Sequence, residues 1–228
     1  MAQEGQTTPA GIRLRKGTGT RPTGKASAER IIKSANALLA KGGRAQFSVR
    51  NVAAHAGLHL ANVQYYFPTR DALIHALFQD IGGRYRQAYE RCLAAAPSDR
   101  VARFRAVLAF NLKDIGRPAT RRYFVQLWAL LDSLDGSSGR RLNELYEVDI
   151  TQLSERIAEI DPAAPAAEVR RRATLLAAMI EGLMIVQGAH GPDENEKKRL
   201  MKQAQELGFS IALGRLDGNR ALADSNGE

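Results

Sequence analysis

The chain has 228 residues, of which 44% are hydrophobic, enough for one large domain or for a small domain joined to a larger one. Its net charge is +9, and aromatic residues make up only 6% while Ala, Leu and Arg are abundant, which favours helices over sheets. The single cysteine excludes a disulfide framework, and no apolar run suits a signal peptide or a membrane span. We therefore expect a soluble, cytoplasmic protein with no membrane partner.

The positive charge is concentrated at one end of the chain. Residues 1–70 contain 11 Lys or Arg and two acidic residues, whereas residues 71–228 contain 22 basic and 22 acidic residues. A basic surface is what the neutralisation of nucleic-acid phosphates requires. Residues 1–25 alone could instead be a basic solubility tail. The charge of residues 30–70 favours a nucleic-acid partner.

Residues 1–25 are rich in Gly, Thr, Lys and Arg and lack hydrophobic periodicity, which predicts a disordered basic arm. We expect the first helix to begin near Ser27, a good N-cap, and to end at Gly42 and Gly43. One apolar stripe marks its buried face: Ile31, Ile32, Ala35, Leu38 and Leu39.

The next residues predict two short helices joined by a turn. Ser48 is placed to cap the first of them, and Gly57 permits the positive φ of its C-terminal turn. The second runs from about His59 to Tyr66, and Thr69 caps a longer helix that follows. Two short helices joined by a turn containing Gly are typical of a helix-turn-helix.

The remainder of the chain is predicted to be helical. We place helices at 99–115, 119–134, 138–160, 165–189 and 194–214, separated by Gly, Pro and Asp breakers. Sustained alternation and Asn-Gly hairpin turns are absent, so the sequence predicts no strands. The predicted fold is all-α, with a three-helix DNA-binding domain at residues 26–72, a larger helical domain at 73–216 and a disordered tail at 217–228.

Residues 27–75 resemble the DNA-binding domain of the tetracycline-repressor (TetR) family of bacterial transcriptional regulators. The stretch from Ser48 to Ala53 and the triplet Ala56-Gly57-Leu58 match one block of the family pattern, and Tyr66-Phe67 with Thr69-Arg70 and Leu73 match the rest. The close match covers about a fifth of the chain. It implies a homodimeric regulator, most often a repressor, that binds a palindromic operator in double-stranded DNA and is released by a small-molecule effector.

The resemblance also implies which residues bind DNA. Asn62 and Gln64 are candidates for base edges, because amides pair bidentately with adenine. Ser48, Tyr65 and Arg70 are expected to bind phosphates. His59 stands where the family usually has Ser or Thr. The expected DNA-binding set is Ser48, Arg50, His59, Leu60, Ala61, Asn62, Gln64, Tyr65 and Arg70.

In the second half, the last two helices are apolar on more than one face, so each must bury two faces. One face suits the subunit core and the other a two-fold interface, and a purely internal core is the alternative. The expected interface residues are Leu176, Met179, Ile180, Leu183, Met184, Leu200, Ala204, Leu207 and Ile211. The family resemblance implies an effector cavity among the middle helices, with Phe104, Phe110, Tyr123, Phe124, Trp128 and Tyr146 as candidates; a purely structural core of aromatic residues is the alternative.

We expect no metal, no cofactor and no catalytic activity. His55 and His59 have the i, i+4 spacing of a metal pair, but Gly57 breaks the helix between them. No Gly-rich phosphate loop, nucleophile elbow or Cys/His pairing stands out. Two other classes remain open: a protein that coats DNA without sequence preference, and a small-molecule enzyme with a vestigial helix-turn-helix. The sequence identifies neither the operator nor the effector.

Overall fold

The computed structural model describes residues 22–131, 138–186 and 193–215. All regular secondary structure within these ranges is helical, and no described helix is long and apolar enough to cross a membrane. The predicted all-α fold is confirmed. Most of the predicted basic arm and the tail at 217–228 lie outside the described residues.

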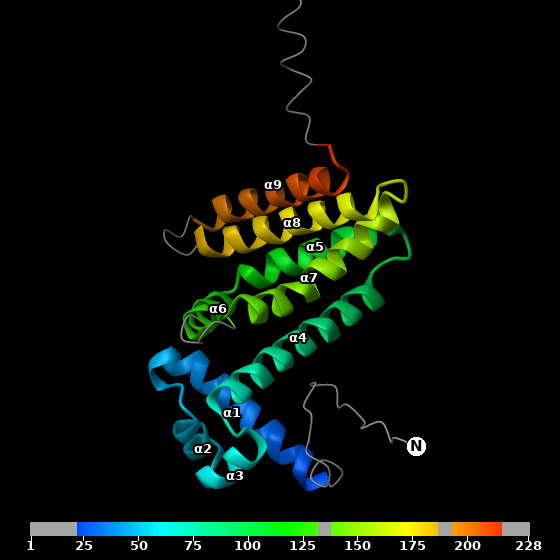
Figure 1. Cartoon of the computed structure of the whole chain (residues 1–228). Coiled ribbons are helices and arrows are strands. Elements are labelled where there is room, and N and C mark those ends of the chain that lie inside the picture. The colour runs from blue at the N-terminus through cyan, green and yellow to red at the C-terminus, as the bar shows by residue number, and fades with distance from the viewer. Residues whose placement is uncertain (1–21, 132–137, 187–192, 216–228) are drawn as a thin grey trace, which may run out of the picture. The chain divides into compact units, whose positions relative to one another are not determined.

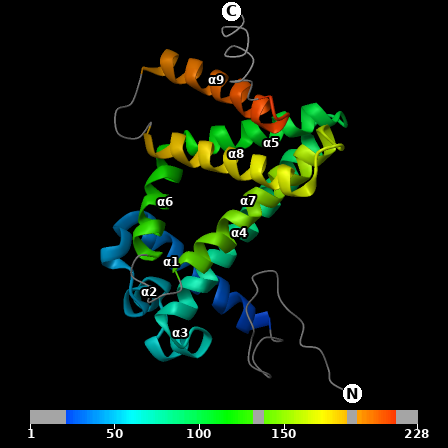
Figure 2. The same cartoon turned by 45° about the horizontal axis from the view of Figure 1, so that its top comes forward.

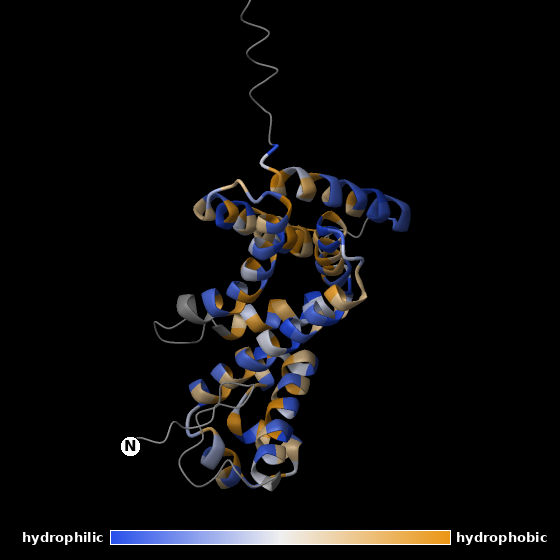
Figure 3. Cartoon of the chain, turned by 90° about the vertical axis from the view of Figure 1, so that its right-hand side faces the viewer, coloured by the Kyte–Doolittle hydropathy of each residue, from blue (hydrophilic) through white to orange (hydrophobic). Residues whose placement is uncertain are grey.

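Figure 1 labels the helices in chain order. They are α1 (Pro22–Gln46), α2 (Val49–Ala56), α3 (Leu60–Tyr66), α4 (Arg70–Ala95), α5 (Arg100–Ile115), α6 (Pro118–Leu131), α7 (Ser138–Ile160), α8 (Ala166–Val186) and α9 (Glu194–Ala212). Hydrophobic and hydrophilic residues are interleaved along these helices (Figure 3), as expected of amphipathic helices that bury one side.

Helix α1 begins earlier than predicted. It starts at Pro22, so Ser27 lies inside the helix and residues 22–25 of the predicted arm are helical. Proline is favoured in the first turn of a helix, where its missing N–H has no partner to lose. The ion pair between Lys25 and Glu29, at 3.8 Å and i, i+4 spacing, further supports this turn. The predicted break at the other end is found at Gly43, whose φ of 61° and ψ of −162° are not helical.

The chain forms two compact units. The first comprises Met1–Ala88 and Ala119–Val148, and the second comprises Tyr89–Pro118 and Asp149–Glu228. Helices α4 and α7 therefore each contribute residues to both units. The predicted boundary between residues 72 and 73 falls inside the first unit and remains a prediction about domains.

In the first unit, α1, α2 and α3 pack against one another. Ile31 and Leu39 of α1, Val52 of α2 and Val63 of α3 are fully buried. Phe67, which follows α3, is only 2% exposed, so it belongs to this core as predicted. Burial of these apolar side chains supplies the main stabilisation of the short helices, which would be marginal alone.

In the second unit, α5, α8 and α9 pack together, and Figures 1 and 2 show α8 and α9 side by side. Gly208 of α9 makes this approach possible. A Cβ at that position would lie 2.7 Å from Leu108 Cδ2 and 3.3 Å from Leu176 Cδ2. A larger residue there would require the Leu108 side chain, or α9 itself, to shift.

Candidate nucleic-acid interface

Helix α2 is fixed at its start by two side chains. Ser48 is extended, and its Oγ accepts a hydrogen bond from the Asn51 N–H at 3.1 Å, as predicted for an N-cap. The Asn51 side chain donates from Nδ2 to the Gln46 carbonyl at 2.8 Å. Val52 is buried against the core, which leaves Arg50 on the exposed side of α2.

Gly57 sets the turn between α2 and α3. Its φ of 61° and ψ of 39° are left-handed, a conformation that Gly adopts without a Cβ clash. The Gly57 N–H donates to the Ala54 carbonyl at 3.1 Å, and the Leu58 N–H donates to the Ala53 carbonyl at 3.0 Å. These are the two hydrogen bonds of a Schellman motif. The turn therefore fixes the direction in which α3 leaves α2.

Helix α3 buries one residue, Val63, and exposes its opposite side. Asn62, Gln64 and Tyr65 are exposed, and Tyr65 has 60% of its surface accessible. Its ring meets that of Tyr66 edge to face, with centroids 5.3 Å apart, which holds it in position. The exposed side of α3 is thus lined by amide and phenol groups that can bond to base edges and phosphates.

The ends of this segment differ in how well they are capped. His59 precedes α3, and its side chain forms no capping hydrogen bond, in line with its departure from the family's Ser or Thr. Thr69 caps α4, since its Oγ1 accepts from the Ala72 N–H at 3.0 Å. Arg70 therefore lies in the first turn of α4, where the helix dipole favours an anion.

None of the nine predicted DNA-binding residues is buried. Ser48, Leu60 and Arg70 are half-buried, and the other six, Arg50, His59, Ala61, Asn62, Gln64 and Tyr65, are exposed. All nine belong to α2, α3, their caps or the first residue of α4. Contact with DNA by these residues remains a prediction.

A polar network that the sequence did not predict connects α1, α4 and α6 within the first unit. Asn36 donates from Nδ2 to Asp80 Oδ2 at 3.0 Å, while its Oδ1 accepts from Arg84 at 3.0 Å and from the Tyr123 hydroxyl. Arg84 also pairs with Asp80 at 3.1 Å. Burial raises the pKa of Tyr123, against the opposing effect of Arg84, so the phenol stays protonated and can donate.

Four of the six predicted ligand-binding aromatics lie close together in the first unit. The ring of Phe124 is 6.0 Å from Tyr123, 6.3 Å from Trp128 and 6.1 Å from Tyr85, measured between centroids. Trp128 donates from Nε1 to the Tyr146 hydroxyl at 3.0 Å. Phe124 is buried and the other three are half-buried, so these residues also fit the alternative of a structural aromatic core.

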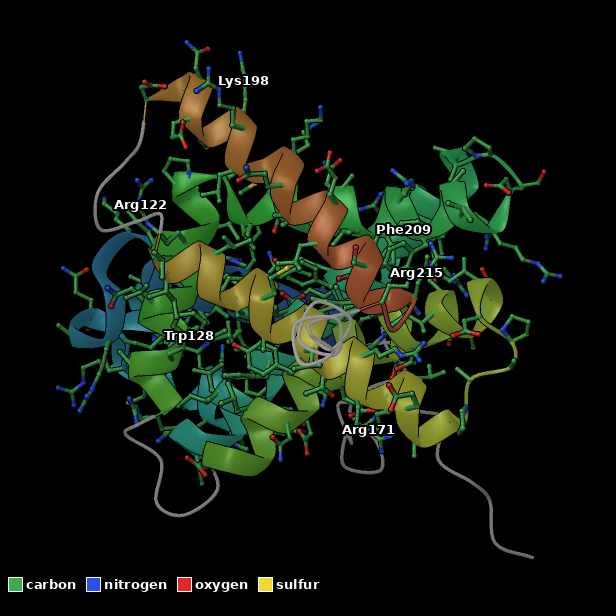
Figure 4. All side chains as sticks on the ribbon, turned by 90° about the horizontal axis from the view of Figure 1, so that it is seen from above. Arg122, Trp128, Arg171, Lys198, Phe209 and Arg215 are labelled. Atoms are coloured by element: carbon green, nitrogen blue, oxygen red, sulfur yellow. The ribbon has the colours of Figure 1, made fainter. Side chains whose placement is uncertain are left out.

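The other two predicted ligand-binding residues, Phe104 and Phe110, belong to the second unit. Phe104 is fully buried and packs on Phe209 of α9, which Figure 4 labels, with ring centroids 5.9 Å apart. The guanidinium carbon of Arg105 lies 4.4 Å from the centroid of the same Phe209 ring. Phe104 is therefore a core residue that presents no surface to a ligand in this structure. Phe110 keeps some accessible surface and packs edge to face on Tyr89 at 5.3 Å.

The predicted dimer residues divide into two groups. Leu176, Ile180, Met184, Ala204 and Ile211 are buried inside the subunit, so their side chains are not available to a partner in this conformation. Met179, Leu183 and Leu200 are half-buried, and Leu207 is 49% exposed. Leu175 (52% exposed), Ile185 and Val186 of α8 are exposed but were not predicted. Helical periodicity marked the apolar faces and could not tell which face points outward.

A capped helix, a glycine turn and a second helix with an exposed polar side define a helix-turn-helix DNA-binding protein. Comparison with known proteins narrows this class. Residues 31–77 match the family described as "Bacterial regulatory proteins, tetR family". The HTH-type transcriptional regulator BetI of Burkholderia thailandensis (strain ATCC 700388 / DSM 13276 / CCUG 48851 / CIP 106301 / E264) is 31% identical over 162 residues, covering 70% of this chain and 80% of that protein. The chain belongs to the TetR family of bacterial transcriptional regulators.

Solved structures share the fold. A TetR transcription regulator from Haloarcula marismortui has a TM-score of 0.65 at 19% identity and covers 83% of this chain and 98% of its own. The multidrug binding protein EbrR, solved in complex with ethidium, has a TM-score of 0.59 at 21% identity and covers 81% of this chain and 98% of its own. These likenesses extend well beyond the helix-turn-helix.

Proposed function

We propose that this protein is a repressor that binds a palindromic operator as a homodimer and leaves it when a small molecule binds. The observation that carries the proposal is the exposed polar side of α3, held by a capped α2 and the Gly57 turn. The excess positive charge of residues 1–70 supports it, because phosphate contacts supply most of the affinity for DNA.

In this proposal α3 enters the major groove. Asn62 and Gln64 contact base edges, since each exposed amide can both donate and accept. Arg50 and Tyr65 reach phosphates on either side of the groove, and Arg70 holds a phosphate at the start of α4. Base contacts then supply specificity, and phosphate contacts supply affinity and register.

The homodimer proposal rests on the apolar surface that α8 and α9 leave exposed. Leu175, Ile185 and Val186 of α8 and Leu207 of α9 are large hydrophobic residues with open surface. Exposed large hydrophobic residues on two neighbouring helices are a feature of interaction surfaces. A two-fold arrangement would pair the same patch on both subunits and would present two α3 helices to two operator half-sites.

The network at Asn36 supports the release step. Tyr123 of α6 donates to Asn36 of α1, and the Gln126 side chain of α6 accepts from the Arg44 N–H at 3.2 Å. A ligand that favours another position of α6 would thereby change the position of α1 and of the helices packed on it. The ethidium complex of EbrR supports small-molecule binding by this fold. The ligand need only bind the non-operator conformation more tightly.

A gel-shift experiment with the DNA upstream of the protein's own gene tests the proposal. Asn62→Ala should reduce discrimination between operator and random DNA, by about 1–3 kcal/mol for a lost bidentate contact. Arg50→Ala should weaken binding to all sequences and reduce the salt dependence. Lys113→Ala, which removes an exposed charge from α5, is the matched control and should change neither. Equal binding of the wild type to operator and random DNA at physiological salt would overturn the proposal in favour of a sequence-tolerant protein.

A further inference from the structure

Three polar side chains meet inside the second unit. Tyr89 of α4 is 1% exposed, and its hydroxyl lies 2.6 Å from Asn111 Oδ1 of α5 and 2.8 Å from Asp149 Oδ1 of α7. Asn111 is 6% exposed, whereas Asp149 is half-buried. The ring of Phe110, also half-buried, packs on the ring of Tyr89. The cluster is therefore inside the unit but keeps accessible surface at Asp149 and Phe110.

The Tyr89 hydroxyl cannot donate a hydrogen bond to both of its neighbouring oxygens. The Tyr89 hydroxyl has one hydrogen but approaches two oxygens. Asp149 can be protonated and donate to Tyr89, which then donates to Asn111. Alternatively, the Asn111 amide can be turned so that Nδ2 donates to Tyr89, which then donates to an ionised Asp149.

Either arrangement leaves Asn111 with an atom that has no partner. As placed, the buried Nδ2 has no hydrogen-bond partner among the described residues. After the turn, Oδ1 takes its place and becomes an unfilled acceptor close to the carboxylate. Buried polar atoms without partners are rare in folded proteins, so each calls for an explanation. A ligand that supplies the missing partner is one explanation.

The charge of the cluster indicates what that partner carries. Asp149 forms no salt bridge with any described residue, and Asp114, one turn beyond Asn111, contributes further negative potential. Burial raises the pKa of Asp149 to about 6, against the opposing effect of the Tyr89 hydrogen bond. A carboxylate in this setting is stabilised by a nearby positive charge.

We propose that Asp149 and Asn111 bind the protonated amine of an organic cation, with its apolar body against Phe110. The ammonium donates to the Asp149 carboxylate and to the turned Asn111 Oδ1, while Tyr89 donates to Asp149 and holds it in place. The Phe110 ring adds apolar contact with the body of the ligand. This inference rests on the proposed response to a small-molecule effector, and it names the chemistry of that effector.

Calorimetric titration of the full-length protein tests the inference with paired probes. Each pair is an arylmethylamine and the corresponding arylmethanol, with benzyl, naphthylmethyl or anthracenylmethyl as the aryl group, so the two members differ in charge but little in shape. We expect at least one amine to bind the wild type tenfold or more tightly than its alcohol. Asp149→Asn should remove that preference, and Glu206→Gln, which neutralises an exposed carboxylate on α9, should retain it.

Two results would overturn the inference: no preference for any of the three amines in the wild type, or a preference that survives in Asp149→Asn. The wild-type comparison needs no variant, so a folding defect in Asp149→Asn cannot obscure it. The operator gel shift without ligand is separate. Operator binding together with no amine preference would overturn only the cation site, whereas loss of operator specificity would overturn the proposed function.

Discussion

Replacement of Asp149 by Asn should stabilise the protein at neutral pH. The variant keeps the shape of the carboxyl group, and its Nδ2 can donate to the Tyr89 hydroxyl, which then donates to Asn111, as in the protonated wild type. Burial raises the pKa of Asp149 to about 6 in the folded protein, from an ordinary value of 3.8. At 1.36 kcal/mol per pKa unit, ionised Asp149 lowers the free energy of unfolding by ~3 kcal/mol.

The direction of this pH dependence follows from proton binding. Between pH 4 and pH 6 the folded state holds the Asp149 proton more tightly than the unfolded state, so the stability from this group rises as pH falls. It is fully present below the unfolded pKa of about 4 and is lost as pH rises through about 6. At pH 7.5 the Asn variant should therefore be more stable than the wild type by up to ~3 kcal/mol. Near pH 4 the two should be equal.

Urea unfolding followed by circular dichroism measures this difference at pH 4.5, 5.5, 6.5 and 7.5. Protomer concentration must be held constant, since the proposed dimerisation would contribute to the apparent stability. A gain of ~3 kcal/mol corresponds to a rise in Tm of about 6–12 °C for a chain of this size. Glu206→Gln is the control and should show no comparable pH dependence. A variant less stable than the wild type at pH 7.5, or a difference that does not change with pH, would refute this account of Asp149.

Four further changes follow from the described contacts. Tyr123→Phe removes the hydrogen bond to Asn36 and should lower the free energy of unfolding by about 1 kcal/mol, measured by urea titration. An unchanged unfolding midpoint would show that this hydrogen bond does not stabilise the fold. Gly57→Ala places a Cβ at a φ of 61° and should lower the Tm through a cost of about 1–2 kcal/mol. Ser48→Ala removes the α2 cap and should cost about 1 kcal/mol, and equal stability would contradict the capping role. Leu207→Asp should convert a dimer to a monomer in size-exclusion chromatography with light scattering, and a dimer that persists would place the interface elsewhere.

The helix boundaries that were predicted well depend on local signals. Ser48, Gly57 and Thr69 act on their own turns, so the sequence was sufficient to place α2, α3 and the start of α4. The predicted start of α1 was wrong because Ser27 has the chemistry of a cap, whereas the helix begins at Pro22. A residue that can cap a helix can also lie inside one when the residues before it are helical, so a capping residue alone does not fix where a helix starts.

The polar clusters were missed because they join residues that are distant in the sequence. Asn36 and Tyr123 are 87 residues apart in the sequence, and Tyr89 and Asp149 are 60 residues apart. One signal was nevertheless present. Asn111 lies between Leu108 and Leu112 on the apolar stripe of α5, and a polar residue at a buried register is unusual without a partner. Such positions indicate that a partner exists and leave its identity to the tertiary structure.

The sequence also could not show which apolar face of α8 is buried inside the subunit. The apolar pattern of the sequence predicts that both faces are buried, but it does not indicate which face packs in the subunit core and which against a partner. In the structure Leu176 and Ile180 are buried, while Leu175 and Val186 keep their surfaces exposed. Because neighbouring positions 175 and 176 differ by about 100° around the helix axis, an error of one position can move a side chain from the buried face to the exposed one. The exposed side therefore has to be read from the packed helices, and it is this side that a second copy of the chain would cover.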